Sequence, residues 1–228
     1  MMSASRLSFD VVSASWMRYA DVAQIAKPSI AYPVALESRS VLLEPLSLKH
    51  LDDFCAEGLD PELWRWTMIS VREAAGMRSY IEKALEDARA GTAAPFAIIA
   101  RSTGHAVGST RYGNIASEHR RLEIGWTWLS RAWQRTPFNT ETKYLLLRHA
   151  FEALGCIRVE FKADVLNLRS REALRRIGAV EEGIFRHHLI TDTGRIRDTV
   201  YYSIVDGDWP EVKKLLEAKI ARPWRDHP

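Results

Sequence analysis

The sequence contains little cysteine and no long hydrophobic run. Its 228 residues include two cysteines, Cys55 and Cys156, which lie far apart in the chain. Two isolated cysteines exclude a disulfide framework and a zinc site built from clustered cysteines, and they favour a reducing compartment. No run of about 18 apolar residues occurs, so the sequence predicts no segment that spans a membrane.

An excess of charge of one sign is also missing. The 32 Lys and Arg residues against 29 Asp and Glu residues leave a net charge of +3. This excess is too small for a dedicated nucleic-acid-binding protein, although an acidic ligand stays open. The glycine-rich dinucleotide motif, the P-loop, the serine nucleophile elbow and the His-Glu-x-x-His zinc motif are all absent. The adjacent pair His187 and His188 would face opposite sides of a strand, so we expect no metal site there.

What is present is the composition of a globular protein, with 46% hydrophobic and 27% charged residues. Residues 1–32 interrupt their apolar positions with serine, and they lack the continuous apolar region of a secretory signal. Asp10 and Asp21 argue against a transit peptide. We expect an N-terminal extension over 1–32, one domain over 33–221 and a tail over 222–228.

Apolar periodicity and turn residues predict the secondary structure of this domain. Strands are expected at 40–45, 95–100, 105–112, 122–129, 157–161, 183–191 and 195–205. Helices are expected at 47–54, 72–90, 139–154, 168–177 and 210–221. Consecutive strands favour antiparallel pairing, whereas the strand–helix–strand order over 122–161 favours one parallel pair joined by a crossover helix. The expected fold class is α+β with a mixed sheet.

The segment from Glu123 to Gly178 is the most informative. Strict alternation in 122–129 would place Leu122, Ile124, Trp126 and Trp128 on one face and Glu123, Gly125 and Thr127 on the other. After a loop, a helix is expected to begin at Asn139, and a helix start is a natural anion site that suits a pyrophosphate. Asn167 is expected to cap the next helix, with Ser170 in its first turn.

Short motifs in a fixed order carry a family resemblance over about 33–206. They are Leu42-Leu-Glu-Pro45, Glu123-Ile-Gly-Trp126, Asn139-Thr-Glu141, Asn167-Leu-Arg-Ser170, Arg176-Ile-Gly178, Glu182-Gly183, Arg197-Asp198 and Tyr201-Tyr202. In this order the chain resembles the GNAT acyltransferase superfamily, in particular the branch of RimJ/RimL-type ribosomal-protein N-acetyltransferases. The resemblance implies a GNAT-type acyl-CoA N-acyltransferase fold, with a mostly antiparallel mixed sheet, a splayed parallel strand pair and flanking helices.

The resemblance also implies acetyl-CoA as cosubstrate and no metal. The family's phosphate loop carries two glycines, and at these positions the chain has Pro137 and Asn139. Asn139 tolerates the left-handed backbone conformation that a glycine would supply. The contacts to acetyl-CoA that the resemblance implies come from Trp128, Leu129, Gln134, Arg135, Thr136, Phe138, Asn139, Thr140 and Asn167.

Two residues carry the chemistry that the resemblance implies. Glu123 matches a base or a water-relaying carboxylate, and its alternative is a solvated strand residue. Ser170 matches a proton or hydrogen-bond donor to the leaving sulfur, and its alternative is a role in the helix N-terminus. Many relatives place a tyrosine at the position of Leu174, so that residue is absent here. Asn167 is either the helix N-cap or a contact to the pantetheine arm.

The function expected from the resemblance is acetyl-CoA-dependent N-acetylation of a primary amine by direct transfer. The acceptor is a protein N-terminus or a small amine, and Trp64 and Trp66 are candidates to contact it or to pack in the core. A non-catalytic acyl-CoA-binding or regulatory module is the main alternative, and a protein that acts through its terminal segments is a third. We expect a cytoplasmic protein that can form a homodimer and that binds neither membrane nor nucleic acid.

Overall fold

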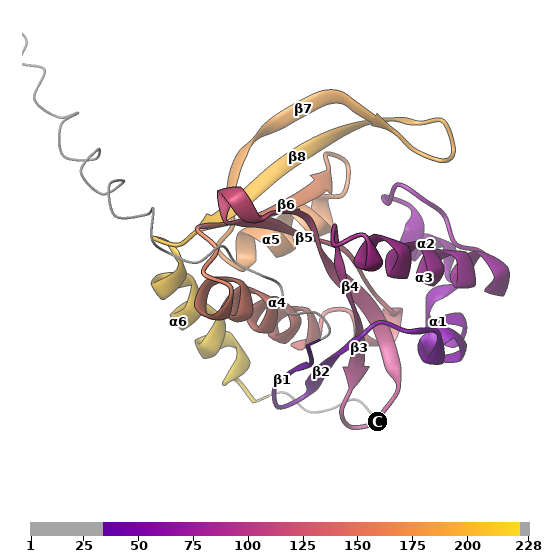
Figure 1. Ribbon diagram of the computed structural model, residues 1–228, viewed down its shortest axis with the longest axis horizontal. Coiled ribbons are helices and arrows are strands. Elements are labelled where there is room, and N and C mark those ends of the chain that lie inside the picture. The colour runs from indigo at the N-terminus through magenta and orange to yellow at the C-terminus, as the bar shows by residue number, and fades with distance from the viewer. Residues whose placement is uncertain (1–33, 224–228) are drawn as a thin grey trace, which may run out of the picture.

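The computed structural model of the protein describes residues 34–223. The expected extension over 1–32 and most of the expected tail over 222–228 therefore lie outside the described residues. Within the described part, eight strands form one sheet in the order β1-β2-β3-β4-β5-β6-β8-β7. The sheet separates two layers of helices (Figure 1).

The elements expected from the sequence are present, and their ends differ by a few residues. The strands are β1 (Leu36–Glu37), β2 (Val41–Pro45), β3 (Ala94–Ala100), β4 (Ala106–Ala116), β5 (Arg121–Leu129), β6 (Arg158–Asp164), β7 (Val180–Ile190) and β8 (Ile196–Val205). The helices are α1 (Leu51–Gly58), α2 (Pro61–Trp64), α3 (Ala74–Arg89), α4 (Phe138–Arg148), α5 (Leu168–Arg176) and α6 (Trp209–Ile220). The short elements β1 and α2 were not expected, because two or four residues carry no periodicity.

The predicted crossover is confirmed. Strands β5 and β6 are parallel neighbours, joined by α4, and all other strand pairs of the described sheet are antiparallel. Parallel pairing is limited to residues 121–123 of β5 and 158–160 of β6. Both strands continue beyond this short ladder, so their C-terminal halves diverge and leave a gap in the sheet.

Each face of the sheet buries its own apolar cluster. On one face α4 and α6 pack with residues that include Leu122, Phe138, Leu146, Phe161 and Leu216. On the other face α1 and α3 pack around Phe54, Trp64, Met77, Ile81 and Trp128. Side chains of the diverging strands therefore reach one of two different environments, depending on the face they occupy.

The alternation predicted for 122–129 holds through Gly125, which lies on the face of Glu123, and is wrong from Trp126 onward. Gly125 pairs with Arg111 and Trp128 pairs with Ser109, so two residues of β5 oppose the single residue between them on β4. This β-bulge places Trp126 in the left-handed region with φ 49° and leaves it 45% exposed. Thr127 turns toward α4 instead of sharing the face of Glu123. Alternation is a property of regular strands, and one extra residue reverses it.

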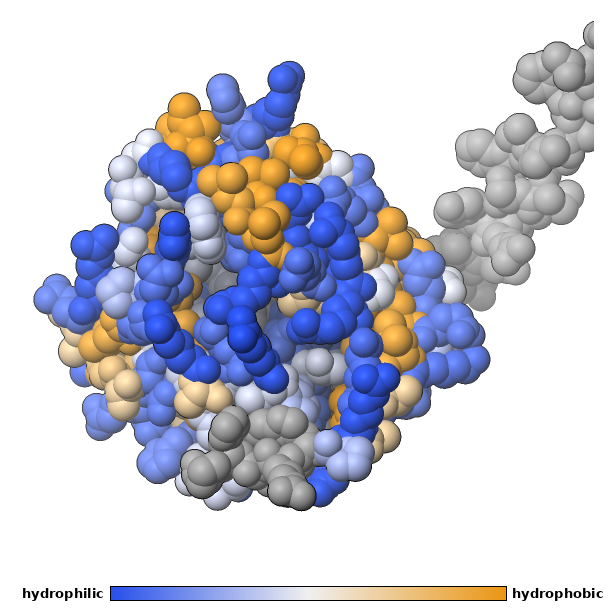
Figure 2. Space-filling model, turned by 180° about the vertical axis from the view of Figure 1, so that it is seen from behind, coloured by the Kyte–Doolittle hydropathy of each residue, from blue (hydrophilic) through white to orange (hydrophobic). Residues whose placement is uncertain are grey.

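The outer hairpin exposes apolar side chains. Ile184, Phe185 and Ile190 of β7 are each about half exposed or more. Figure 2 shows hydrophobic groups gathered at the top of the molecule, where β7 and β8 lie in Figure 1, above a mostly hydrophilic face.

Candidate active site

Glu123 lies at the point where β5 and β6 begin to diverge. Its side chain is buried, and its Oε2 accepts hydrogen bonds from Lys162 Nζ at 2.7 Å and from Asn114 Nδ2 at 2.5 Å. Burial works against a charge on Lys162, but the carboxylate of Glu123 outweighs it and raises the pKa of Lys162. Glu123 is therefore a buried carboxylate that two hydrogen bonds fix in position, and it is not a solvated strand residue.

An open groove adjoins this carboxylate. Asn114, Lys162 and Tyr201 line it together with Arg121 and Glu160, whose side chains pair with each other at 3.3 Å. The groove gives solvent a route to the polar face of β5 and β6.

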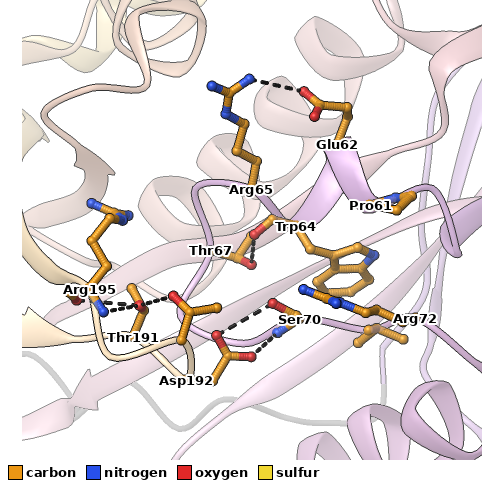
Figure 3. A pocket seen from close by; sticks show the side chains of 12 residues that line it. Pro61, Glu62, Trp64, Arg65, Thr67, Ser70, Arg72, Thr191, Asp192 and Arg195 are labelled. Carbon is orange, nitrogen blue, oxygen red and sulfur yellow. Dashed lines mark hydrogen bonds and ion pairs between the residues drawn. The ribbon is translucent and has the colours of Figure 1, made fainter.

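A second hollow of about 240 Å³ lies between the α2–α3 connection and the turn that joins β7 to β8. The two segments are tied together, because Ser70 N donates to Asp192 Oδ2 at 2.5 Å and Asp192 N donates to Met68 O at 3.1 Å. Figure 3 shows Asp192 turned toward Ser70, and Arg65 turned toward Glu62. This hollow is a candidate site for the acceptor.

The two tryptophans near this hollow differ in their surroundings. Trp64 is buried and contacts Tyr80 and Trp128 edge-on or tilted, so it serves the core. Trp66 lies between two cations, with the guanidinium of Arg65 at 4.9 Å and that of Arg195 at 5.4 Å from its ring centre. Arg195 is also bound to the buried carboxylate of Asp164 at 2.5 Å. Trp66 is thus the one of the pair that faces polar groups.

The loop between β5 and α4 differs from expectation in its backbone. Arg135 adopts the left-handed conformation with φ 64°, whereas Asn139 has no positive φ and lies in the first turn of α4. The expectation that Asn139 replaces a left-handed glycine is wrong, because the helix begins at Phe138, directly after Pro137. Pro137 presets the φ that a helix start needs.

Gln134 connects three parts of the candidate acetyl-CoA site. Its Nε2 donates to Leu129 O at 2.8 Å, and its Oε1 accepts from Arg169 of α5 at 2.6 Å. The loop is therefore tied both to the end of β5 and to the helix that follows β6. Thr136 Oγ1 donates to Trp133 O at 2.6 Å, which tightens the turn before α4.

The remaining residues expected to contact acetyl-CoA fall into two groups. Trp128 and Phe138 are buried with their rings in the two apolar clusters, so only their backbone atoms are suited to a ligand in the gap. Asn139 and Thr140 are half-buried in the first turn of α4, where helix amides lack partners within the helix.

The start of α5 follows the sequence prediction. Asn167 Oδ1 accepts from Ser170 N at 3.0 Å, so Asn167 is the N-cap of this helix. The side chain of Leu174 is buried in the core. Ser170 is half-buried, and it is the backbone amide of this residue, rather than its hydroxyl, that takes part in the cap.

Two buried charged residues of α4 were missed from the sequence. Glu141 Oε2 accepts from Ser38 Oγ at 2.5 Å and from Ser40 N at 3.0 Å, which fixes α4 to the turn between β1 and β2. Lys143 is 5% exposed, and its Nζ donates to Thr127 Oγ1 at 2.8 Å. The sequence could have indicated that Lys143 is buried, since this residue lies three and four residues before Leu146 and Leu147 on the apolar stripe of the helix.

Within residues 34–223, no group of three or more His, Cys, Asp or Glu side chains could hold a metal ion. None of the helices in that part of the chain is long and apolar enough to cross a membrane. The backbone amide of His187 donates to the side-chain Oδ1 of Asp198 at 2.6 Å. Asp198 is thus bound within its own hairpin.

Comparison with known proteins finds similarity to GNAT acetyltransferases. The Acetyltransferase (GNAT) domain family matches residues 40–180. YdaF of Bacillus subtilis (strain 168), provisionally named a ribosomal N-acetyltransferase, is 34% identical over 106 residues. That match covers 46% of this chain and 57% of YdaF, less than two thirds of the relative's length.

Solved structures extend the likeness to most of the chain. A provisionally assigned acetyltransferase from T. thermophilus is 38% identical, with a TM-score of 0.78, and the likeness covers 84% of this chain and all of that one. Mycobacterium smegmatis RimJ, solved in complex with CoA-disulfide, shares the fold at 23% identity and a TM-score of 0.73, over 85% of this chain and 98% of its own. With a splayed parallel pair, a crossover helix and a family match over residues 40–180, the chain belongs to the GNAT acetyltransferase family.

Proposed function

We propose that the protein transfers the acetyl group of acetyl-CoA directly to a primary amine. The observation that carries the proposal is the gap between β5 and β6, which opens after Glu123 and Glu160. It is bordered on one side by the start of α4 and on the other by the polar groove at Glu123. A thioester and an amine could meet there from opposite faces of the sheet.

The fit to acetyl-CoA rests on three features of this chain. The first turn of α4 offers backbone amides to a pyrophosphate. Gln134 fixes the loop before it against β5 and α5. The backbone of β5 beyond the bulge pairs with no residue of β6, so its polar groups border the gap and can polarise a thioester carbonyl.

In this proposal Glu123 takes up the proton that the attacking amine loses, directly or through a water molecule in the groove. Lys162 and Asn114 hold the carboxylate in place. Asn167 would border the pantetheine arm at the start of α5, and Ser170 would donate a hydrogen bond to the sulfur. The acceptor would approach from the hollow beside Asp192 and Arg195.

The acceptor is proposed to be the N-terminus of a protein, because YdaF is named for ribosomal acetylation. A small amine is the alternative. The polar lining of the hollow, with Arg65, Arg72 and Arg195 beside Glu62 and Asp192, suits the polar main chain of a peptide terminus. The protein would act in the compartment that holds ribosomes.

Calorimetry with acetyl-CoA, followed by thiol release with a panel of peptides and small amines, tests this function. We expect binding, and CoA release that depends on one class of amine. Binding without release for every amine would favour the non-catalytic alternative, in which the ion pair of Glu123 with Lys162 is a structural contact. Absence of binding would contradict both.

A further inference from the structure

Lys143 of α4 is buried beside the gap between β5 and β6. Its Nζ lies 2.8 Å from Thr127 Oγ1 of β5 and 5.9 Å from the ring centre of Phe161 of β6. Both neighbours lie beyond Glu123 and Glu160, the last parallel pair of the two strands. The amine of Lys143 therefore lies where the two strands have begun to separate, on the side of α4.

The groups around this amine are neutral. Thr127 and Thr110 share a hydrogen bond of 2.8 Å, and Phe161 closes the opposite side. Burial without a compensating charge lowers the pKa of Lys143 to about 7.

The charged groups of the same elements are engaged elsewhere. On α4 itself, Glu141 accepts hydrogen bonds from Ser38 and Ser40. On the strands, Glu123 and Glu160 lie on the groove face, where Lys162 and Arg158 respectively bind them. On the π-helical turn His149–Ala153, which continues α4, His149 contacts Tyr112, and burial together with Arg148 lowers the pKa of His149. Among residues 34–223, no carboxylate is therefore paired with Lys143.

A proton donor at the leaving sulfur assists direct transfer, because it neutralises the thiolate as it departs. The tyrosine that many relatives place in α5 is replaced by Leu174, which is buried. The Ser170 hydroxyl can donate a hydrogen bond, but an aliphatic alcohol keeps its proton at neutral pH. An ammonium group that titrates near neutral pH can give its proton away and regain it between turnovers.

We propose that the ammonium group of Lys143 delivers the proton that the departing CoA sulfur takes up. The inference rests on the proposed acetyl transfer. The nitrogen of the acceptor forms a bond to the acetyl carbon, and the carbon–sulfur bond breaks with its electron pair on sulfur. A proton of Lys143 Nζ passes to this sulfur and leaves a neutral amine, which takes a proton from solvent. The proton lost by the acceptor amine leaves through Glu123.

This role gives the reaction a pH dependence that a structural lysine would not give. Lys143 must be protonated, so kcat falls as the pH rises through about 7, where its pKa lies. Thr127 supports the ammonium form through its hydroxyl oxygen, so Thr127→Val moves this decrease to lower pH. Lys143→Met removes the decrease and lowers kcat below pH 7 by roughly 10²–10⁴-fold, the range for a general acid.

The test measures kcat against pH for the wild type, Lys143→Met, Thr127→Val and Ser170→Ala. We expect Ser170→Ala to keep the alkaline decrease at its wild-type position, which separates a hydrogen-bond donor from the proton donor. Acetyl-CoA affinity, measured by calorimetry, should change by less than roughly tenfold in Lys143→Met, or about 1.4 kcal/mol. A Lys143→Met enzyme with wild-type kcat, or with the alkaline decrease unchanged, would overturn the inference.

A second readout does not depend on activity. In a carbon–proton NMR titration of the lysine side chains, one Cε signal should titrate near pH 7 in the wild type and be missing in Lys143→Met. A Lys143 signal that titrates near pH ~10, as an ordinary lysine does, overturns the inference. A wild type that releases no CoA overturns the proposed function and the inference together, whereas turnover with an unaffected variant overturns the inference alone.

Discussion

Lys143 and Lys162 flank the same gap between β5 and β6 but lie in opposite electrostatic surroundings. Lys162 faces the groove and binds Glu123 at 2.7 Å, and this carboxylate raises its pKa despite burial. Lys143 belongs to α4, on the other face of the sheet, and its Nζ donates to the neutral hydroxyl of Thr127; burial lowers the pKa of Lys143 to about 7. Burial alone thus does not decide the charge of a lysine, because a bound carboxylate reverses its effect.

The different surroundings of the two lysines match the different roles that we propose for the two faces of the sheet. On the groove face, Lys162 and Asn114 hold the Glu123 carboxylate in place, and the proposed role of this carboxylate is to take up the proton of the acceptor amine. On the α4 face, the proposed role of Lys143 is to give a proton to the departing sulfur. The bulge in β5 makes this division possible, because it turns Thr127 toward α4 while Glu123 faces the groove.

Removal of Lys162 should give the largest loss of stability. Lys162→Met leaves the carboxylate of Glu123 buried without its cation, and breaking a buried pair in this way costs about 3–5 kcal/mol. Urea denaturation at pH 7 measures the loss. The double variant with Glu123→Gln should recover most of it, and equal losses in the single and double variants would show that the pair does not carry the effect.

Removal of Lys143 should have the opposite sign. Lys143→Met replaces a buried charge by an apolar chain of similar size, which should raise the free energy of unfolding at pH 6 by about 2–4 kcal/mol. Between pH 7 and about 10.4 the unfolded lysine holds a proton that the folded one has released. The stability of the wild type therefore falls as the pH decreases toward 7. At pH 6 the folded protein carries the buried charge on Lys143, and this charge lowers its stability.

The sign of the pH dependence follows from the lowered pKa of Lys143. The unfolded state binds more protons than the folded state above pH ~7, so the wild type gains stability as the pH rises toward ~10. The advantage of Lys143→Met should therefore shrink over the same range. Denaturation curves for both proteins at pH 6, 8 and 10 measure this change, and an advantage that does not depend on pH would mean that folding leaves the pKa of Lys143 unshifted.

Ser170 should contribute less than a full acid–base step. Loss of one hydrogen bond to the sulfur in Ser170→Ala should lower kcat by roughly 10²-fold, the lower end of the range for proton transfer. Ser79→Ala on the exposed face of α3 is a matched control, because Ser79 donates to its own helix at 3.1 Å. Equal activity of both variants would mean that Ser170 has only a structural role at the N-terminus of α5.

The smallest expected effect concerns the start of α4. Asn139→Val places a branched side chain beside the first-turn amides, and we expect a roughly tenfold weaker Kd for acetyl-CoA, or about 1.4 kcal/mol. Glu211→Val, in the exposed first turn of α6, controls for a branched residue at a helix start. An unchanged Kd for Asn139→Val, measured by calorimetry, would place the pyrophosphate elsewhere.

Long periodic segments made the fold predictable, and local exceptions made parts of the site unpredictable. The order of strands and the crossover helix follow from the apolar patterns and turns, and Asn167 caps α5 as its sequence indicates. The bulge at Trp126 has no such signal, because its cause is the fit of two strands to each other. Alternation therefore misplaced Trp126 and Thr127.

Partners distant in sequence explain the other differences. The pairing of Glu123 with Lys162 joins two strands, and a sequence pattern does not show which lysine meets which carboxylate. Lys143 was detectable as a charged residue on an apolar helix stripe, but its hydrogen bond to Thr127 depends on the bulge. The left-handed residue of the loop is Arg135, because Pro137 and the early start of α4 move the turn away from Asn139.

The most direct test of the division between the two faces is the pH profile of kcat/KM for the wild type and Glu123→Gln with an accepted amine. Because a primary amine is mostly protonated at pH 7, we expect the variant to lose roughly 10³-fold there, within the range for a general base. The loss should shrink as the pH rises and neutral amine becomes available. A Glu123→Gln enzyme as active as the wild type at pH 7 would contradict the account.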